Sequence, residues 1–125
     1  MTLPKLSSII QTHTLTLSDD LTVSFQIRPI PGVEYQQIID EHADEHGKTP
    51  FEVIAIPVLT AGITTVYSSV ESTPADFTEA DATELWEQWP EWARWDIYRA
   101  VIEYTTKGPG GNPFSASKPN ENDEQ

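Results

Sequence analysis

Apolar and polar residues alternate along residues 13–28, which is the pattern of a β-strand with one buried face. The apolar positions in this stretch are Leu15, Leu17, Leu21, Val23, Phe25 and Ile27. Ser18-Asp19-Asp20 interrupts the alternation with residues typical of a turn between paired strands. The pattern predicts a β-hairpin over 13–28, and its apolar face needs a helix or another strand to cover it.

Three further stretches have apolar residues at helical spacing. Pro29-Ile30-Pro31-Gly32 cannot continue a strand and leads into the first helix, over residues 32–46, with Gly47 as its stop. Thr78 precedes acidic residues in a first turn, which predicts a helix over 78–89. Pro90 separates that helix from another over 91–107, which ends at Gly108.

Residues 50–68 carry conflicting signals. Thr49-Pro50 is typical of a helix start, because proline is favoured in the first turn. Six apolar β-branched residues favour strands instead: Val53, Ile54, Ile56, Val58, Ile63 and Val66. We expect a helix over 50–68 with a kink near Pro57, and a hairpin within 53–70 stays open as the alternative.

These elements predict one globular domain over residues 1–107, of α+β class and mostly helical. The N-terminal β-hairpin would pack on three to four helices. Residues 108–125 are rich in Gly, Pro, Asn and acids, so we expect a flexible, disordered C-terminal tail. The uncharged stretch 53–70 is too polar for a membrane span, and the N-terminus lacks the basic and apolar regions of a secretory signal.

The charge balance limits the classes of partner. The 125 residues include 20 acidic and 7 basic ones, for a net charge of −13, and no cysteine. Nucleic-acid binding depends on clustered Lys and Arg, so we expect no nucleic-acid partner and no membrane partner. An acidic chain favours basic protein partners. The absence of cysteine excludes disulfides and thiolate metal sites.

One motif suggests a metal. His42-Ala43-Asp44-Glu45-His46 matches the H-x-x-E-H pattern, in which two histidines one helical turn apart bind zinc. Such a site needs a third ligand and a cleft, and His13 is the only other histidine. We interpret the motif as a solvated helix face and expect no metal, no cofactor and no catalytic residues.

The tryptophans are the strongest candidates for function. They occupy every third position of one stretch: Trp86, Trp89, Trp92 and Trp95. A continuous helix would spread them over about half its circumference. We expect Pro90 to divide them, with the first pair in the core and the second pair, beside Arg94 and Tyr98, available to a partner. The alternative is that Trp92 and Trp95 only cover neighbouring turns.

The order of elements and five short motifs resemble a known family. The motifs are Arg28-Pro29-Ile30-Pro31-Gly32, Ile38-Ile39-Asp40-Glu41-His42, Thr49-Pro50-Phe51, Phe77-Thr78-Glu79-Ala80-Asp81 and Asn112-Pro113-Phe114-Ser115. Together they span nearly the whole chain. The chain resembles the tail assembly chaperones of long-tailed, siphovirus-type bacteriophages that infect actinobacteria.

This resemblance implies a non-catalytic role in virion assembly. Members of that family bind the tape measure protein in the host cytoplasm, keep its apolar helix from aggregating, assist tail tube polymerisation and are absent from the mature virion. Many are also made in a longer form by ribosomal frameshifting. The major tail protein is a second candidate partner, and a homo-oligomer stays open. We expect partner contacts at Trp92, Trp95, Tyr98 and, in the tail, Phe114.

Two alternatives come from other classes of protein. An acidic inhibitor that mimics DNA, as in phage counter-defence, would use the net charge of −13. It would need carboxylates in a regular array, whereas Arg94 and Arg99 interrupt the densest acidic stretch. A structural protein that completes the tail or head is the other alternative, and it would be present in purified particles.

Overall fold

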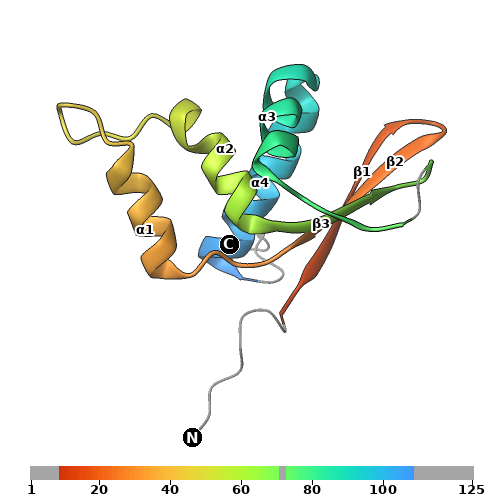
Figure 1. Cartoon of the computed structure of the whole chain (residues 1–125), viewed down its shortest axis with the longest axis horizontal. Helices are drawn as coiled ribbons and strands as arrows, with labels where there is room; N and C mark the ends of the chain where they lie inside the picture. The colour runs from red at the N-terminus through yellow and green to blue at the C-terminus, as the bar shows by residue number, and fades with distance from the viewer. Residues whose placement is uncertain (1–8, 71–72, 109–125) are drawn as a thin grey trace, which may run out of the picture.

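A four-stranded antiparallel sheet and four helices make up the described part of the chain, in a computed structural model that describes residues 9–70 and 73–108 (Figure 1). In chain order the elements are β1 (Gln11–Ser18), β2 (Leu21–Ile27), α1 (Gly32–Glu41), α2 (Phe51–Gly62), β3 (Ile63–Ser68), β4 (Ala75–Asp76), α3 (Glu79–Gln88) and α4 (Glu91–Lys107). The predicted α+β class, with an N-terminal hairpin and four helices, is confirmed. The prediction of a flexible tail falls almost wholly outside the described residues.

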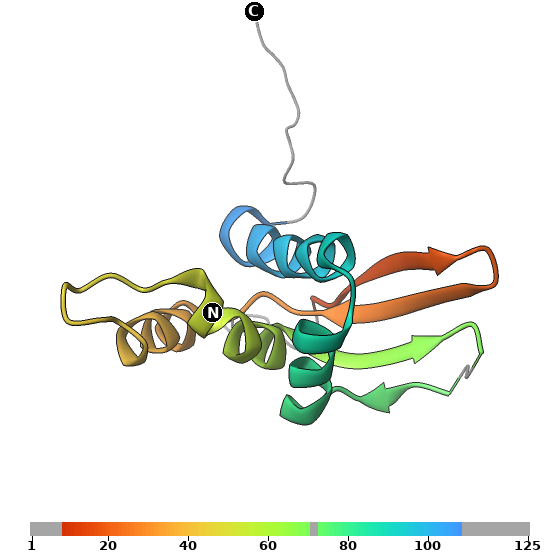
Figure 2. The ribbon, with the colours of Figure 1, turned by 90° about the horizontal axis from the view of Figure 1, so that it is seen from above.

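The sheet has the order β1-β2-β3-β4, so β2 is flanked on both sides (Figure 2). β1 and β2 form the predicted hairpin, in register from Gln11 opposite Ile27 to Thr16 opposite Thr22. β2 also pairs with β3, where Phe25 lies opposite Val66. Phe25 and Ile27 are each only 1% exposed. The second strand of the hairpin is therefore the buried centre of the sheet.

The helix predicted over 50–68 is wrong in its last third. α2 passes through Pro57 and ends at Gly62, and residues 63–68 continue directly as strand β3. The run Ile63-Thr64-Thr65-Val66 is β-branched throughout, and it gains backbone partners from β2. The alternative of a hairpin over 53–70 is also wrong, because residues 53–62 are helical.

The helix predicted over 32–46 is too long. α1 ends at Glu41 because Asp44 organises the following turn. Its side-chain Oδ1 accepts hydrogen bonds from the backbone N–H groups of His46 and Lys48, both at 2.9 Å. Such local bonds offer the backbone an alternative to the helix. Gly47 has φ +76°, a conformation that favours glycine, and completes the turn.

The last two helices agree with the prediction over 78–89 and 91–107. Thr78 and Asp81 form a capping box at the start of α3, where each side chain bonds the backbone N–H of the other. α3 ends at Gln88, and Pro90 is the N-cap of α4. Pro90 therefore does separate two helices, since a proline inside a continuous helix would remove a hydrogen bond and clash.

The core lies where α2, α3 and α4 pack together and α4 packs on β1, whereas α1 packs mainly on α2 at the periphery (Figures 1 and 2). Fully buried core residues come from sheet and helices alike: Phe25, Ile27, Val58, Leu59, Ile97 and Val101. In the part of the chain that the structure describes, no helix is long and apolar enough to cross a membrane.

Gly62 allows α2 to approach α4 closely, which generates a stability prediction. A Cβ added at Gly62 would collide with Cγ1 of the fully buried Val101. Gly62→Ala should lower the free energy of unfolding by about 1–3 kcal/mol, because overpacking outweighs the usual gain of alanine in a helix. Urea denaturation would measure this. In the double variant with Val101→Ala the two losses should not add, and full additivity would exclude the collision.

Candidate functional site

Arg94 holds the junction between α3 and α4. Its Nη1 donates a hydrogen bond of 2.6 Å to the carbonyl oxygen of Trp86, in the last turn of α3. That turn contains no basic residue of its own. The guanidinium carbon also lies 4.8 Å from the centroid of the Trp86 ring, within cation–π range. One side chain thus caps α3 and fixes the orientation of the first tryptophan.

The structure divides the tryptophans differently from the prediction. Trp86 and Trp95 lie on opposite sides of Pro90, yet their ring centroids are 6.0 Å apart at an interplanar angle of 70°. Phe51 from α2 lies 4.6 Å from Trp95 edge-to-face, and Tyr98 lies 5.7 Å from Trp86. These four rings form an aromatic cluster. Trp95 is therefore partly buried with Trp86, whereas Trp92 is exposed.

The break at Pro90 is the physical reason for this pairing. Trp95 and Tyr98 of α4 both contact the ring of Trp86 in α3, on the other side of Pro90. Trp92 has the same spacing of three residues from Trp95, yet it lies in the first turn of α4 and is exposed. Sequence spacing alone contains no information on the angle between two helices.

Trp89 joins the helices to the sheet. Its ring centroid lies 6.0 Å from that of Phe25 on β2, and Phe25 in turn meets Phe77 edge-to-face at 6.2 Å. Both Trp86 and Trp89 pack against the core, as predicted for this pair. The two side chains serve different contacts, however: Trp86 joins helices to each other, and Trp89 joins α3 to the sheet.

Trp92 is the one tryptophan that is mostly open to solvent, with 55% of its surface exposed. It lines a shallow hollow of about 570 Å³ on α4, together with Glu91, Trp95, Asp96 and Arg99. We call this the Trp92 hollow. Asp96 is fixed there by His13 of β1, whose Nε2 lies 2.8 Å from Asp96 Oδ2. The hollow thus presents two indoles, two carboxylates and one guanidinium, all from α4.

Tyr98 lies beneath this surface rather than on it. Only 8% of the residue is exposed. Burial, with a smaller contribution from Tyr35, raises the pKa of Tyr98 to about 12. The partner contacts predicted for Trp92, Trp95 and Tyr98 stay predictions, and of the three only Trp92 is largely accessible. Phe114 lies outside the described residues.

The zinc-like motif does not have the geometry that its spacing suggested. Because α1 ends at Glu41, His42 and His46 do not share one helical turn. The Nδ1 of His42 bonds the carbonyl oxygen of Ile38 at 2.8 Å, and His46 is exposed in the turn that follows. Within residues 9–70 and 73–108, no three His, Asp or Glu side chains lie together in a way that would hold a metal ion.

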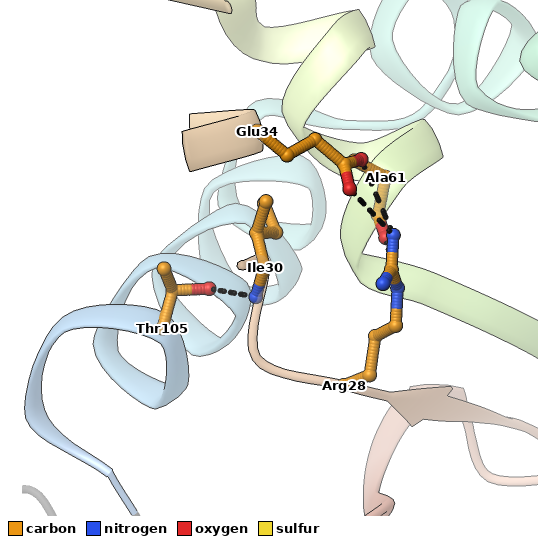
Figure 3. Close-up of polar contacts among 5 residues, drawn as sticks. All are labelled: Arg28, Ile30, Glu34, Ala61 and Thr105. Carbon is orange, nitrogen blue, oxygen red and sulfur yellow. Dashed lines mark hydrogen bonds and ion pairs between the residues drawn. The ribbon is translucent and has the colours of Figure 1, made fainter. Parts of the chain in front are cut away.

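Sequence reasoning missed the role of Arg28. Its Nε donates to the carbonyl oxygen of Ala61 at 2.7 Å, and its Nη2 pairs with Glu34 Oε2 at 3.2 Å (Figure 3). Two residues later, the backbone N–H of Ile30 donates to Thr105 Oγ1 of α4 at 3.1 Å. The segment after β2 is thus tied to three helices. An isolated arginine before proline carries no sequence signal for this.

The aromatic cluster predicts different costs for two tryptophans of α4. Trp95→Ala should lower the free energy of unfolding by about 2–3 kcal/mol, because it removes ring contacts to α2 and α3. Trp92→Ala should change it by less than about 0.5 kcal/mol, since the side chain is mostly solvated. Chemical denaturation of the two variants side by side would decide. Equal losses would mean that Trp92 is also part of the core.

Tyr98 predicts a loss of stability in strongly alkaline solution. An unfolded tyrosine loses its proton near pH 10, whereas Tyr98 in the folded chain does so near pH 12. Between these values the unfolded state binds fewer protons, so stability falls as the pH rises from about 10 to 12. Urea midpoints followed over this range would show the decline. Tyr98→Phe should flatten it, and an unchanged decline in that variant would assign the effect to other groups.

The chain was compared with protein family models, curated proteins and solved structures. No protein family model, curated protein or solved structure matches this chain.

Proposed function

We propose that this chain is a tail assembly chaperone of a long-tailed bacteriophage. In this proposal it is non-catalytic, acts in the host cytoplasm and binds an apolar helical segment of the tape measure protein. It holds that segment in solution while tail tube subunits polymerise, and it does not remain in the mature virion.

The Trp92 hollow is the observation that carries this proposal. A tryptophan that is 55% exposed on a rigid helix is a ready anchor for a partner, because Trp and Arg dominate binding energy once they lose contact with water. Both Trp92 and Arg99 line the hollow. The partly buried Trp95 also lines the hollow and is held by the aromatic cluster, so the surface needs little reorganisation on binding.

The charge of the chain suits a temporary carrier of apolar segments. Three large apolar side chains on helices are exposed: Val33, Val53 and Trp92. Exposed apolar surface promotes association, but a net charge of −13 makes copies of the chain repel each other. Such a protein can cover an apolar partner without aggregating itself.

Co-expression with the tape measure protein of the same genome tests the proposal. The native chain should keep the tape measure protein soluble and co-purify with it. Trp92→Ala should reduce the co-purified amount about tenfold or more, the loss expected for a binding hot spot. Val70→Ala, which shortens another exposed apolar side chain away from the helices, is the matched control and should leave capture unchanged.

Two results would contradict the proposal. If the tape measure protein stays insoluble with the native chain and nothing co-purifies, the chain is not its chaperone. If the chain is a stoichiometric component of purified particles, it is instead a structural protein of the tail or head.

A further inference from the structure

The outer face of α1 is a second exposed surface. Its residues Val33, Gln36, Gln37, Asp40 and Glu41 line a hollow of about 530 Å³. Their spacing of three, four, seven and eight residues places them on one side of the helix. Val33 is 83% exposed, and α1 contains no buried residue at all. A ten-residue helix that buries so little is marginal by itself.

Side-chain hydrogen bonds order this face. Gln36 Nε2 donates to Asp40 Oδ1, and Gln37 Nε2 donates to Glu41 Oε2, both at 3.0 Å. These parallel bonds fix the two carboxylates of the last turn against the amides of the turn before it. The face therefore changes along its length, from an exposed valine through two amides to two carboxylates.

Among the residues that the structure describes, no cation is seen to pair with the carboxylate end of this face. The last turn of α1 contains no basic residue, and the C-terminus of a helix itself carries partial negative charge. Acidic side chains at that position are therefore unfavourable. Arg28 contacts this helix at its first turn, where it pairs with Glu34. A partner that brings a Lys or Arg to Asp40 and Glu41 would relieve this repulsion.

We propose that the outer face of α1 binds an amphipathic, basic helix of a partner protein. The partner helix would place an apolar residue on Val33 and a Lys or Arg on the Asp40–Glu41 pair. Seven residues of helix separate Val33 from Asp40, a length of about 10 Å. The partner should therefore carry its apolar and basic residues about seven positions apart, on one face.

Charge favours a basic partner helix over a second copy of the chain on the outer face of α1. Two α1 faces packed together would bring the carboxylates of one copy close to the acidic or uncharged residues of the other. The inference rests on the proposed function only for the class of partner, a helical protein segment. It adds the chemistry of that segment and a surface distinct from the Trp92 hollow.

Binding of a designed peptide to the full chain tests this inference. The probe is a fluorescein-labelled helical peptide of roughly twenty residues with an Ala/Gln background. Its Leu and Lys residues lie on one face, and each Lys is seven positions from a Leu. A matched peptide has Glu in place of Lys. Fluorescence anisotropy would measure affinity, and NMR shift changes would locate the contact. The native chain should bind the Lys peptide about tenfold more tightly than the Glu peptide. The NMR chemical-shift changes should be concentrated in residues 33–41.

Two double variants separate a specific face from general charge. Asp40→Asn with Glu41→Gln should weaken binding of the Lys peptide about tenfold. Glu84→Gln with Glu87→Gln removes the same charge from exposed positions of α3 and should change affinity less than about twofold. All four positions are exposed, so each variant should fold, which circular dichroism would confirm.

Equal weakening by the two double variants, or equal affinity for the Lys and Glu peptides, would overturn the inference. Its failure is distinguishable from that of the proposed function. If the native chain captures the tape measure protein but does not bind the Lys peptide, only the proposed α1 site is wrong. If the peptide binds at α1 but the tape measure protein is never captured, only the chaperone role is wrong.

Discussion

The contact of Arg28 with the C-terminal end of α2 is the interaction on which the arrangement of elements depends. The backbone N–H of Arg28 donates to the carbonyl oxygen of Gly62 at 2.9 Å, and its Nε donates to that of Ala61 at 2.7 Å. The last carbonyls of a helix have no partner within the helix and carry partial negative charge. A guanidinium at this position satisfies one carbonyl and balances the charge. Because α2 has no basic residue in its own last turn, a residue from the end of β2 performs this role.

This contact explains how a helix turns into a strand without a loop. Once the end of α2 is fixed beside the end of β2, Ile63 is already opposite Ile27, and β3 pairs along β2 from there. The same guanidinium reaches Glu34, so the position of α1 also depends on it (Figure 3). Arg94 likewise donates a hydrogen bond to a backbone carbonyl oxygen in the last turn of α3. Two of the seven basic residues thus stabilise helix ends, and one of them, Arg28, also pairs with Glu34.

Local patterns in the sequence were sufficient for part of this fold. Alternation predicted the hairpin, and Thr78 and Pro90 predicted the limits of the last two helices, because each signal acts through nearby residues. The strand 63–68 could not be assigned from its own residues, since β-branched side chains favour a strand only where a neighbouring strand is available.

The candidate site could likewise be predicted only in part from local sequence. Trp92 was a candidate from residue type, but the pairing of Trp95 with Trp86 depends on an interhelical angle. The periodicity of the outer face of α1 is visible in the sequence, yet it is also the pattern of any solvated helix face.

The internal use of Arg28 and Arg94 also affects what the surface can bind. Arg94 caps the end of α3, and Arg28 pairs with Glu34, so the outer faces of α1 and α4 still carry carboxylates beside exposed apolar residues. An apolar patch by itself attracts any other apolar surface, including a second copy of the chain. Carboxylates around the patch add a long-range repulsion between copies and an attraction toward basic partners. Specificity then comes from combining the two, because only a partner with both apolar and basic residues gains from the whole face. The proposed preference for basic, amphipathic helices thus follows from the acids that these two arginines leave without a cation.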